Sequence, residues 1–194
     1  MNKLLDAIMS KLLQRGFATD ENAEIVRYGL ELIIMKTIIT SAMIAMAIAM
    51  NSVPEVLVFM AVYSVLRSNC GGYHSRSRIA CFFSSLIILT AVIAAVKLIH
   101  CRGDVFCIAA FLCTGLALII ALAPVDTQTK PFDSVERVVF RKRSLITAFI
   151  VLFISASLAL LGLHKLALSA SCAILITGIM LAAGRLTNKK GAVT

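Results

Sequence analysis

The stretch VFCIAAFLCTGLALIIALA, residues 105–123, contains no charged residue. A run of about 20 apolar residues is long enough to cross the hydrocarbon core of a bilayer as a helix. Only helices and closed barrels satisfy their backbone hydrogen bonds in that setting. The apolar residues here are continuous rather than alternating, which argues against a barrel strand and predicts a membrane-spanning helix.

The composition extends this interpretation to the whole chain. Hydrophobic residues make up 60% of the 194 residues and charged residues 15%, against roughly 45–50% and about 25% in soluble domains. The sequence therefore predicts an all-α fold, a polytopic bundle of membrane helices with no large soluble domain. Six hydrophobic segments are expected, at residues 32–50, 53–66, 79–99, 105–123, 145–163 and 166–183.

The second segment, 53–66, is the doubtful one because it is short and carries Glu55. Apolar stretches of about 10–14 residues are often re-entrant or buried rather than spanning. Four full spans with two shorter or re-entrant segments are therefore the alternative to six spans.

The N-terminal residues predict amphipathic helices over residues 1–31. Leucine, isoleucine and methionine recur at helical spacing between Leu4 and Leu13, opposite charged and polar residues. Asp6 and Lys11 interrupt this region, so it does not resemble a signal peptide. Such a helix is expected to lie in the membrane interface or to dock on the spans.

The net charge of +9 is distributed around the apolar segments. If the N-terminus is cytoplasmic, every Lys and Arg except Lys97, Arg102 and Lys165 falls on the inner side of the six-span arrangement. This asymmetry predicts a multi-pass protein of the cell membrane with both termini inside. The bilayer is thus the expected environment, and the charge does not indicate binding to nucleic acid.

The segment LRSNCGGYHSRSRIACFF, residues 66–83, carries the residues suited to chemistry. His74 can act as a base, and Cys81 lies in the first turns of the next helix, where a thiolate is favoured. On one unbroken helix, side chains seven positions apart are about 10 Å apart along the axis. We therefore expect Gly71 and Gly72 to turn the chain so that His74 reaches Cys81, and their N–H groups are candidates for an oxyanion hole.

Other interpretations of this segment remain open. His74 and Cys81 can be unrelated, and Cys70 is a rival nucleophile because it is closer to His74 in sequence. A metal site from Cys70, His74 and Cys81 lacks a fourth ligand at suitable spacing, so neither a metal nor a cofactor is expected. The residues that would orient His74 are undecided among Asn69, Ser84, Ser85 and Asp126.

The pattern Arg67, Gly71-Gly72-Tyr73-His74 and Cys81 resembles the signature of accessory gene regulator protein B (AgrB), a membrane peptidase of Gram-positive quorum sensing. The loop Ala123-Pro124-Val125-Asp126 with Lys130-Pro131 resembles the second recurrent loop of that family. The resemblance covers nearly the whole chain. It implies one peptidase domain over residues 1–194, with the catalytic loop and helix start at 67–81.

The resemblance also implies a reaction. Cys81 would be the nucleophile and His74 its base, and together they would cleave the C-terminal tail from a short precursor peptide. The resulting acyl-thioester would then be attacked by a cysteine or serine of the precursor, closing a thiolactone or lactone ring. A dry site would help the internal nucleophile to compete with water.

Further residues are candidates for substrate binding and assembly. Arg67, Asp126, Lys130 and Arg141 are expected to contact the precursor or one another, although the basic run around Arg141 can also be a topology signal or attract anionic lipid. A small-residue row, Ser169, Ala173 and Thr177, fits helix packing within the chain or a homodimer. The alternative function is a non-enzymatic transporter or channel component for small peptides.

Overall fold

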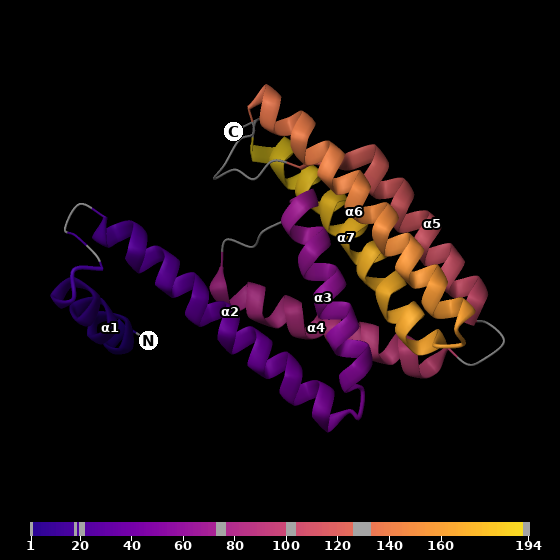
Figure 1. Ribbon diagram of the computed structural model, residues 1–194, viewed down its shortest axis with the longest axis horizontal. Helices are drawn as coiled ribbons and strands as arrows, with labels where there is room; N and C mark the ends of the chain where they lie inside the picture. Colours follow the sequence, from indigo (N-terminus) through magenta and orange to yellow (C-terminus); the bar gives the residue numbers. More distant parts are fainter. Residues whose placement is uncertain are drawn as a thin grey trace. The chain divides into compact units, whose positions relative to one another are not determined.

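The computed structural model describes residues 2–17, 19, 22–72, 77–99, 104–125 and 133–191, and within these ranges every regular element is a helix. This confirms the all-α prediction (Figure 1). The helices are α1 (Asn2–Gln14), α2 (Ala23–Ala49), α3 (Val53–Cys70), α4 (Arg78–Leu98), α5 (Asp104–Leu122), α6 (Ser134–Leu160) and α7 (His164–Gly191).

Six of these helices, α2 to α7, are long and apolar enough to cross a membrane. The chain is therefore a multi-pass membrane protein. The doubtful second segment forms the unbroken 18-residue helix Val53–Cys70, which has the length of a spanning helix. Pro54 lies in its first turn, where the missing N–H costs no hydrogen bond.

Several helices are longer than the apolar segments, and the largest differences are in α2, which begins at Ala23 and not at residue 32, and in α6 and α7. Helix α6 begins at Ser134, well before residue 145, and α7 continues to Gly191, beyond residue 183. The basic residues around Arg141 thus lie on α6 and not in a loop. Arginine, lysine and glutamate favour helix, so the helix extends beyond the apolar part of each segment.

The chain divides into two compact units, Met1–Ala45 and Met46–Thr194. In the first unit, α1 buries Leu5 and Met9, and Asp6 on its polar side pairs with Arg27 of α2 at 3.0 Å. This confirms the amphipathic N-terminal helix. The assignment of residues 1–194 to one peptidase domain stays a prediction.

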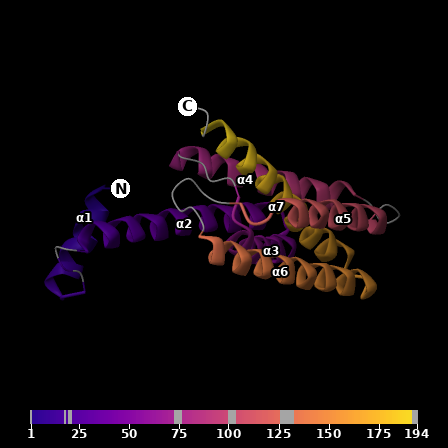
Figure 2. The same cartoon turned by 90° about the horizontal axis from the view of Figure 1, so that it is seen from above.

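In the second unit, α7 is the central helix and packs against α3, α5 and α6. Figure 2 shows α7 passing between α5 and α6. Ser169, Ala173 and Thr177 are all fully buried within the chain, which confirms the packing interpretation of this row. The homodimer stays a prediction, and these residues do not support it.

Glycine sets the distance between α5 and α7. A Cβ atom on Gly115 would lie 2.7–2.9 Å from backbone atoms of Leu175 and Ile174, and one on Gly178 would lie 2.8 Å from the Cβ of Leu118. The two backbones are therefore in direct contact, as in other membrane helix pairs that cross at small residues.

Candidate functional site

Cys81 lies near the N-terminus of α4. Ser77 precedes the helix in an extended conformation, and its hydroxyl accepts a hydrogen bond from the amide of Ala80 at 3.5 Å. The Cys81 amide donates to the Ser77 carbonyl at 3.0 Å, which begins the helical ladder. The side chain of Cys81 is half-buried, so the thiol sits at a capped helix start with access from outside the protein.

The end of α3 is joined to the loop that follows α5. Gly71 pairs in parallel with Val125, and the Val125 amide donates to the Cys70 carbonyl at 3.2 Å. Gly71 has a φ of +73°, and a Cβ there would lie 2.5 Å from the Val125 carbonyl oxygen. Only glycine combines this backbone conformation with so close an approach.

Gly72 lies against two other parts of the same unit. Its φ is +113°, and a Cβ there would lie 2.6 Å from Nη1 of Arg67 and 3.2 Å from the Met180 carbonyl oxygen of α7. Arg67 donates from Nη1 to the Gly71 carbonyl at 3.1 Å. The guanidinium thus closes the C-terminal end of α3, where carbonyl groups lack helical partners.

Helix α6 contributes a further contact at this end of α3. The Ser144 hydroxyl lies 2.8 Å from both the Asn69 carbonyl and the Phe140 carbonyl, and its side chain is fully buried. The end of α3 therefore meets α6, α7 and the residues after α5. We call this meeting point, formed by Arg67, Gly71, Gly72, Val125 and Ser144, the glycine junction.

A family model described as Accessory gene regulator B matches residues 2–182 of the chain. The chain belongs to the accessory gene regulator B family. The matched range runs from α1 through most of α7, so it includes Cys81 and every residue of the glycine junction.

Two relatives share this family name. The chain is 27% identical over 139 residues to an AgrB-like protein of Clostridium perfringens strain SM101. It is 28% identical over 139 residues to AgrB-like protein 2 of Clostridium perfringens strain 13. Each match covers 66% of this chain and 65% of the relative. No solved structure matches the chain significantly.

The catalytic and substrate-binding candidates from the sequence are placed as follows. Cys81 is at the start of α4, and Arg67, Gly71 and Gly72 lie at the glycine junction. Arg141 is exposed on α6, one turn before Ser144. His74, Asp126 and Lys130 lie outside the described residues. The junction is nonetheless where both signature loops begin, since it holds Gly72 and Val125.

The structure bears on three roles that the sequence left open: the rival nucleophile, the oxyanion hole and the residues that would orient His74. Cys70 is fully buried, with no exposed surface from which to attack a peptide. The Gly71 amide donates to the Arg67 carbonyl at 3.2 Å, so that N–H already has a hydrogen-bond partner, and the oxyanion role of the two glycines stays a prediction. The hydroxyls of Ser84 and Ser85 both donate to the Cys81 carbonyl, which occupies their protons within α4.

Sequence reasoning missed two residues near the AgrB signature. Tyr63 lies on α3 one turn before Arg67, and its ring stacks on Phe59 with the ring centres 5.4 Å apart. Its position four residues before Arg67 places both on one face of α3, and this spacing was the available signal. Ser144 carried no such signal, because its contact with Asn69 depends on how α6 packs on α3.

Proposed function

We propose that this chain is a membrane-embedded cysteine endopeptidase that shortens and cyclises a short precursor peptide for quorum sensing. The observation that carries the proposal is the pairing of Gly71 with Val125, from which both signature loops depart, in a chain whose next helix carries Cys81 in its first turn. Membership of the accessory gene regulator B family supports the same reading.

The covalent chain supports a partnership between His74 and Cys81. Ser77, the cap of α4, is three positions after His74 in the chain, so their Cα atoms are at most about 11 Å apart. Cys81 follows Ser77 by about one helical turn, or roughly 5–6 Å. Because the connecting chain is this short, the His74 imidazole can reach the Cys81 thiol. Such reach is the first requirement for a general base.

The proposed reaction has two steps. Cys81 loses its proton to His74 and attacks the carbonyl carbon of the scissile peptide bond. The C–N bond breaks, His74 returns the proton to the leaving amine, and the C-terminal tail departs while the precursor stays bound as a thioester. A cysteine thiol or serine hydroxyl of the precursor then attacks the thioester, the ring closes, and Cys81 is released as a thiol.

The position of Arg141 supports a role in binding the precursor. Arg141 lies one turn from Ser144, whose hydroxyl bonds the end of α3, so its side chain starts close to the glycine junction. We propose that Arg141, Lys130 and Asp126 bind the precursor, with Arg67 shaping the junction. The catalytic loop and both termini would face the cytoplasm, and the chain would act as a homodimer.

A cleavage assay with the full chain in lipid vesicles tests this function. The wild-type chain is expected to release the C-terminal tail from a synthetic precursor, and mass spectrometry should detect the remaining fragment joined to Cys81. Cys81→Ala should release no tail and form no adduct, whereas Cys113→Ala, at an exposed position in mid-α5, should behave as wild type. Tail release by Cys81→Ala would refute the proposal.

A further inference from the structure

Helix α6 has one face that belongs to the bundle. Ser144, Ala148, Val151 and Ser155 follow each other at helical spacing and are all buried. Ser144 bonds the Asn69 carbonyl of α3, and Ser155 donates to the Ala167 carbonyl of α7 at 2.9 Å. These contacts fix the rotation of α6 about its axis, and so they also fix which residues point away from the bundle.

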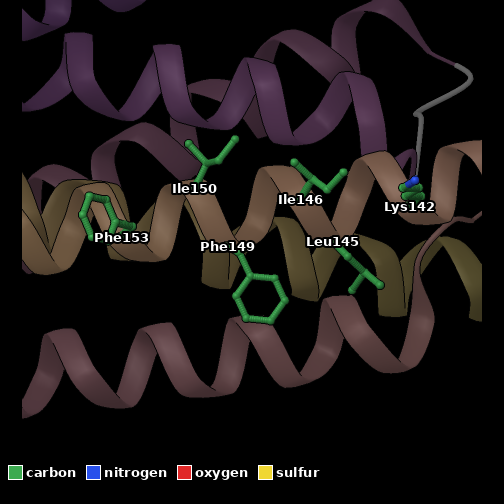
Figure 3. Close-up of a pocket in the computed structure, with 6 residues that line it drawn as sticks. All are labelled: Lys142, Leu145, Ile146, Phe149, Ile150 and Phe153. Carbon is green, nitrogen blue, oxygen red and sulfur yellow. The ribbon is translucent and has the colours of Figure 1, made fainter.

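The opposite face carries a shallow groove of about 570 Å³. Lys142 precedes Ser144 by two residues and therefore lies roughly 160° away from it around the helix. Figure 3 shows the lining side chains spread along this face of α6, with Lys142 at the end nearest the start of the helix. The groove is lined by Lys142, Leu145, Ile146, Phe149, Ile150 and Phe153.

The length of the groove matches one leaflet of a membrane. From Lys142 to Phe153 the helix rises eleven steps of 1.5 Å, or roughly 16 Å. The hydrocarbon core of a bilayer is about 30 Å thick, so one leaflet contributes about 15 Å. With Lys142 at the level of the lipid headgroups, Phe153 lies near the middle of the bilayer.

The chemistry of the groove changes along this length. Apart from Lys142, every lining residue is a hydrocarbon side chain. Next to Lys142 is Arg143, whose guanidinium lies 6.0 Å from the centre of the Phe140 ring. A cationic end followed by an apolar channel matches a phospholipid with a negative headgroup and an extended acyl chain.

We propose that the outer face of α6 is a binding site for one anionic phospholipid. Its acyl chain would lie along Leu145, Ile146, Phe149, Ile150 and Phe153, and its phosphate would contact Lys142. The proposal does not depend on the peptidase function, because this face points away from the Ser144 contact with α3. It also distinguishes two neighbouring cations, because Arg141 lies about 60° from Ser144 around the helix and Lys142 about 160°.

The absence of tryptophan from the chain makes a direct test available. Phe149→Trp places a single indole in the groove, and phospholipids with brominated acyl chains quench indole fluorescence on contact. The full chain would be reconstituted in vesicles containing brominated phosphatidylglycerol or brominated phosphatidylcholine. We expect phosphatidylglycerol to associate about fivefold more strongly, as one cation near an anionic headgroup provides, and added salt to reduce the preference.

Two matched lysine variants test whether Lys142 causes the preference for phosphatidylglycerol. Adding Lys142→Gln to Phe149→Trp should remove it, whereas adding Lys165→Gln, at an exposed lysine on α7, should not. Leu57→Trp, at an exposed position on α3 with no cation within a turn, should be quenched equally by both lipids. If Phe149→Trp does not fold, Phe153→Trp reports on the same groove.

Three outcomes would overturn the proposal. Equal quenching of the groove tryptophan by both lipids would show that the site does not select an anionic headgroup. A preference that survives Lys142→Gln would mean that Lys142 does not hold the phosphate. Loss of quenching on adding an amphipathic precursor peptide, at a peptide concentration far below that of lipid, would assign the groove to the peptide.

Discussion

Gly71 and Val125 lie backbone against backbone, with the Val125 amide bonded to the carbonyl that precedes Gly71 at 3.2 Å. This contact ties the end of α3 to the end of α5. The two loops that resemble the AgrB signature therefore start from one place, although Gly71 and Val125 are 54 positions apart in the chain. A site built from both loops depends on this pair.

Gly71→Ala tests the pair directly. Gly71 has φ +73° and ψ −141°, a backbone conformation in which an alanine costs roughly 1–3 kcal/mol by itself, and its Cβ would also lie 2.5 Å from the Val125 carbonyl oxygen. We expect the free energy of unfolding to fall by more than the cost of this backbone strain. We also expect the variant to lose precursor cleavage. Unfolding in mixed detergent micelles and the cleavage assay measure the two effects.

Gly162→Ala is the matched control for Gly71→Ala. Gly162 has nearly the same φ, +77°, but nothing within 4 Å of its would-be Cβ. This variant should show only the strain of positive φ, roughly 1–2 kcal/mol, and should retain cleavage. Equal losses for the two variants would mean that the approach of Val125 is unimportant.

Gly115→Ala and Gly29→Ala should change stability in opposite directions. Alanine in a helix is favoured over glycine by roughly 0.5–1 kcal/mol, and at Gly29 nothing lies within 4 Å, so this variant should be stabilised. At Gly115 the added methyl meets the α7 backbone at 2.7–2.9 Å, and the helices must separate. A stabilised Gly115→Ala, measured by thermal unfolding in detergent, would contradict the close α5–α7 contact.

Ser144→Ala should loosen α6 from the end of α3. The variant removes the hydroxyl that bonds the Asn69 carbonyl, and hydrogen bonds between membrane helices contribute about 0.6 kcal/mol on average. Ser68→Ala removes only a local bond to Val65 on an exposed surface and should leave stability nearly unchanged. Indistinguishable unfolding free energies for the two variants would argue against the Ser144 contact.

The thiols should differ in their rates of reaction with a charged, membrane-impermeant maleimide. Cys81 is half-buried at a helix start, Cys113 is exposed in mid-α5, and Cys70 is buried. Because moving a charge into the bilayer centre is costly, labelling at Cys113 should be slower than at Cys81 by more than about tenfold. Peptide mapping by mass spectrometry measures each rate.

Two further results complete the labelling experiment. His74→Ala should slow labelling at Cys81 and leave Cys113 unchanged, because the imidazole is the proposed base for that thiol alone. Faster labelling of Cys70 than of Cys81 would contradict the choice of nucleophile, since it would require the end of α3 to open.

The sequence by itself determined the class of fold. The six apolar helices follow from runs such as 105–123, in which local composition and length decide the outcome. It also singled out Cys81, Gly71 and Gly72, because helix breaks and chemically reactive side chains are visible within a few residues of each other. The extension of α6 back to Ser134 was missed because polar helix formers leave no apolar pattern.

Only the tertiary structure decided which segments meet. The approach of Val125 to Gly71, of Ser144 to Asn69 and of Met180 to Gly72 joins residues far apart in the chain. Every apolar helix can present its sides to lipid or to another helix at similar cost. Hydrophobicity therefore cannot choose helix neighbours in this protein, and close backbone packing at glycines and serines makes that choice.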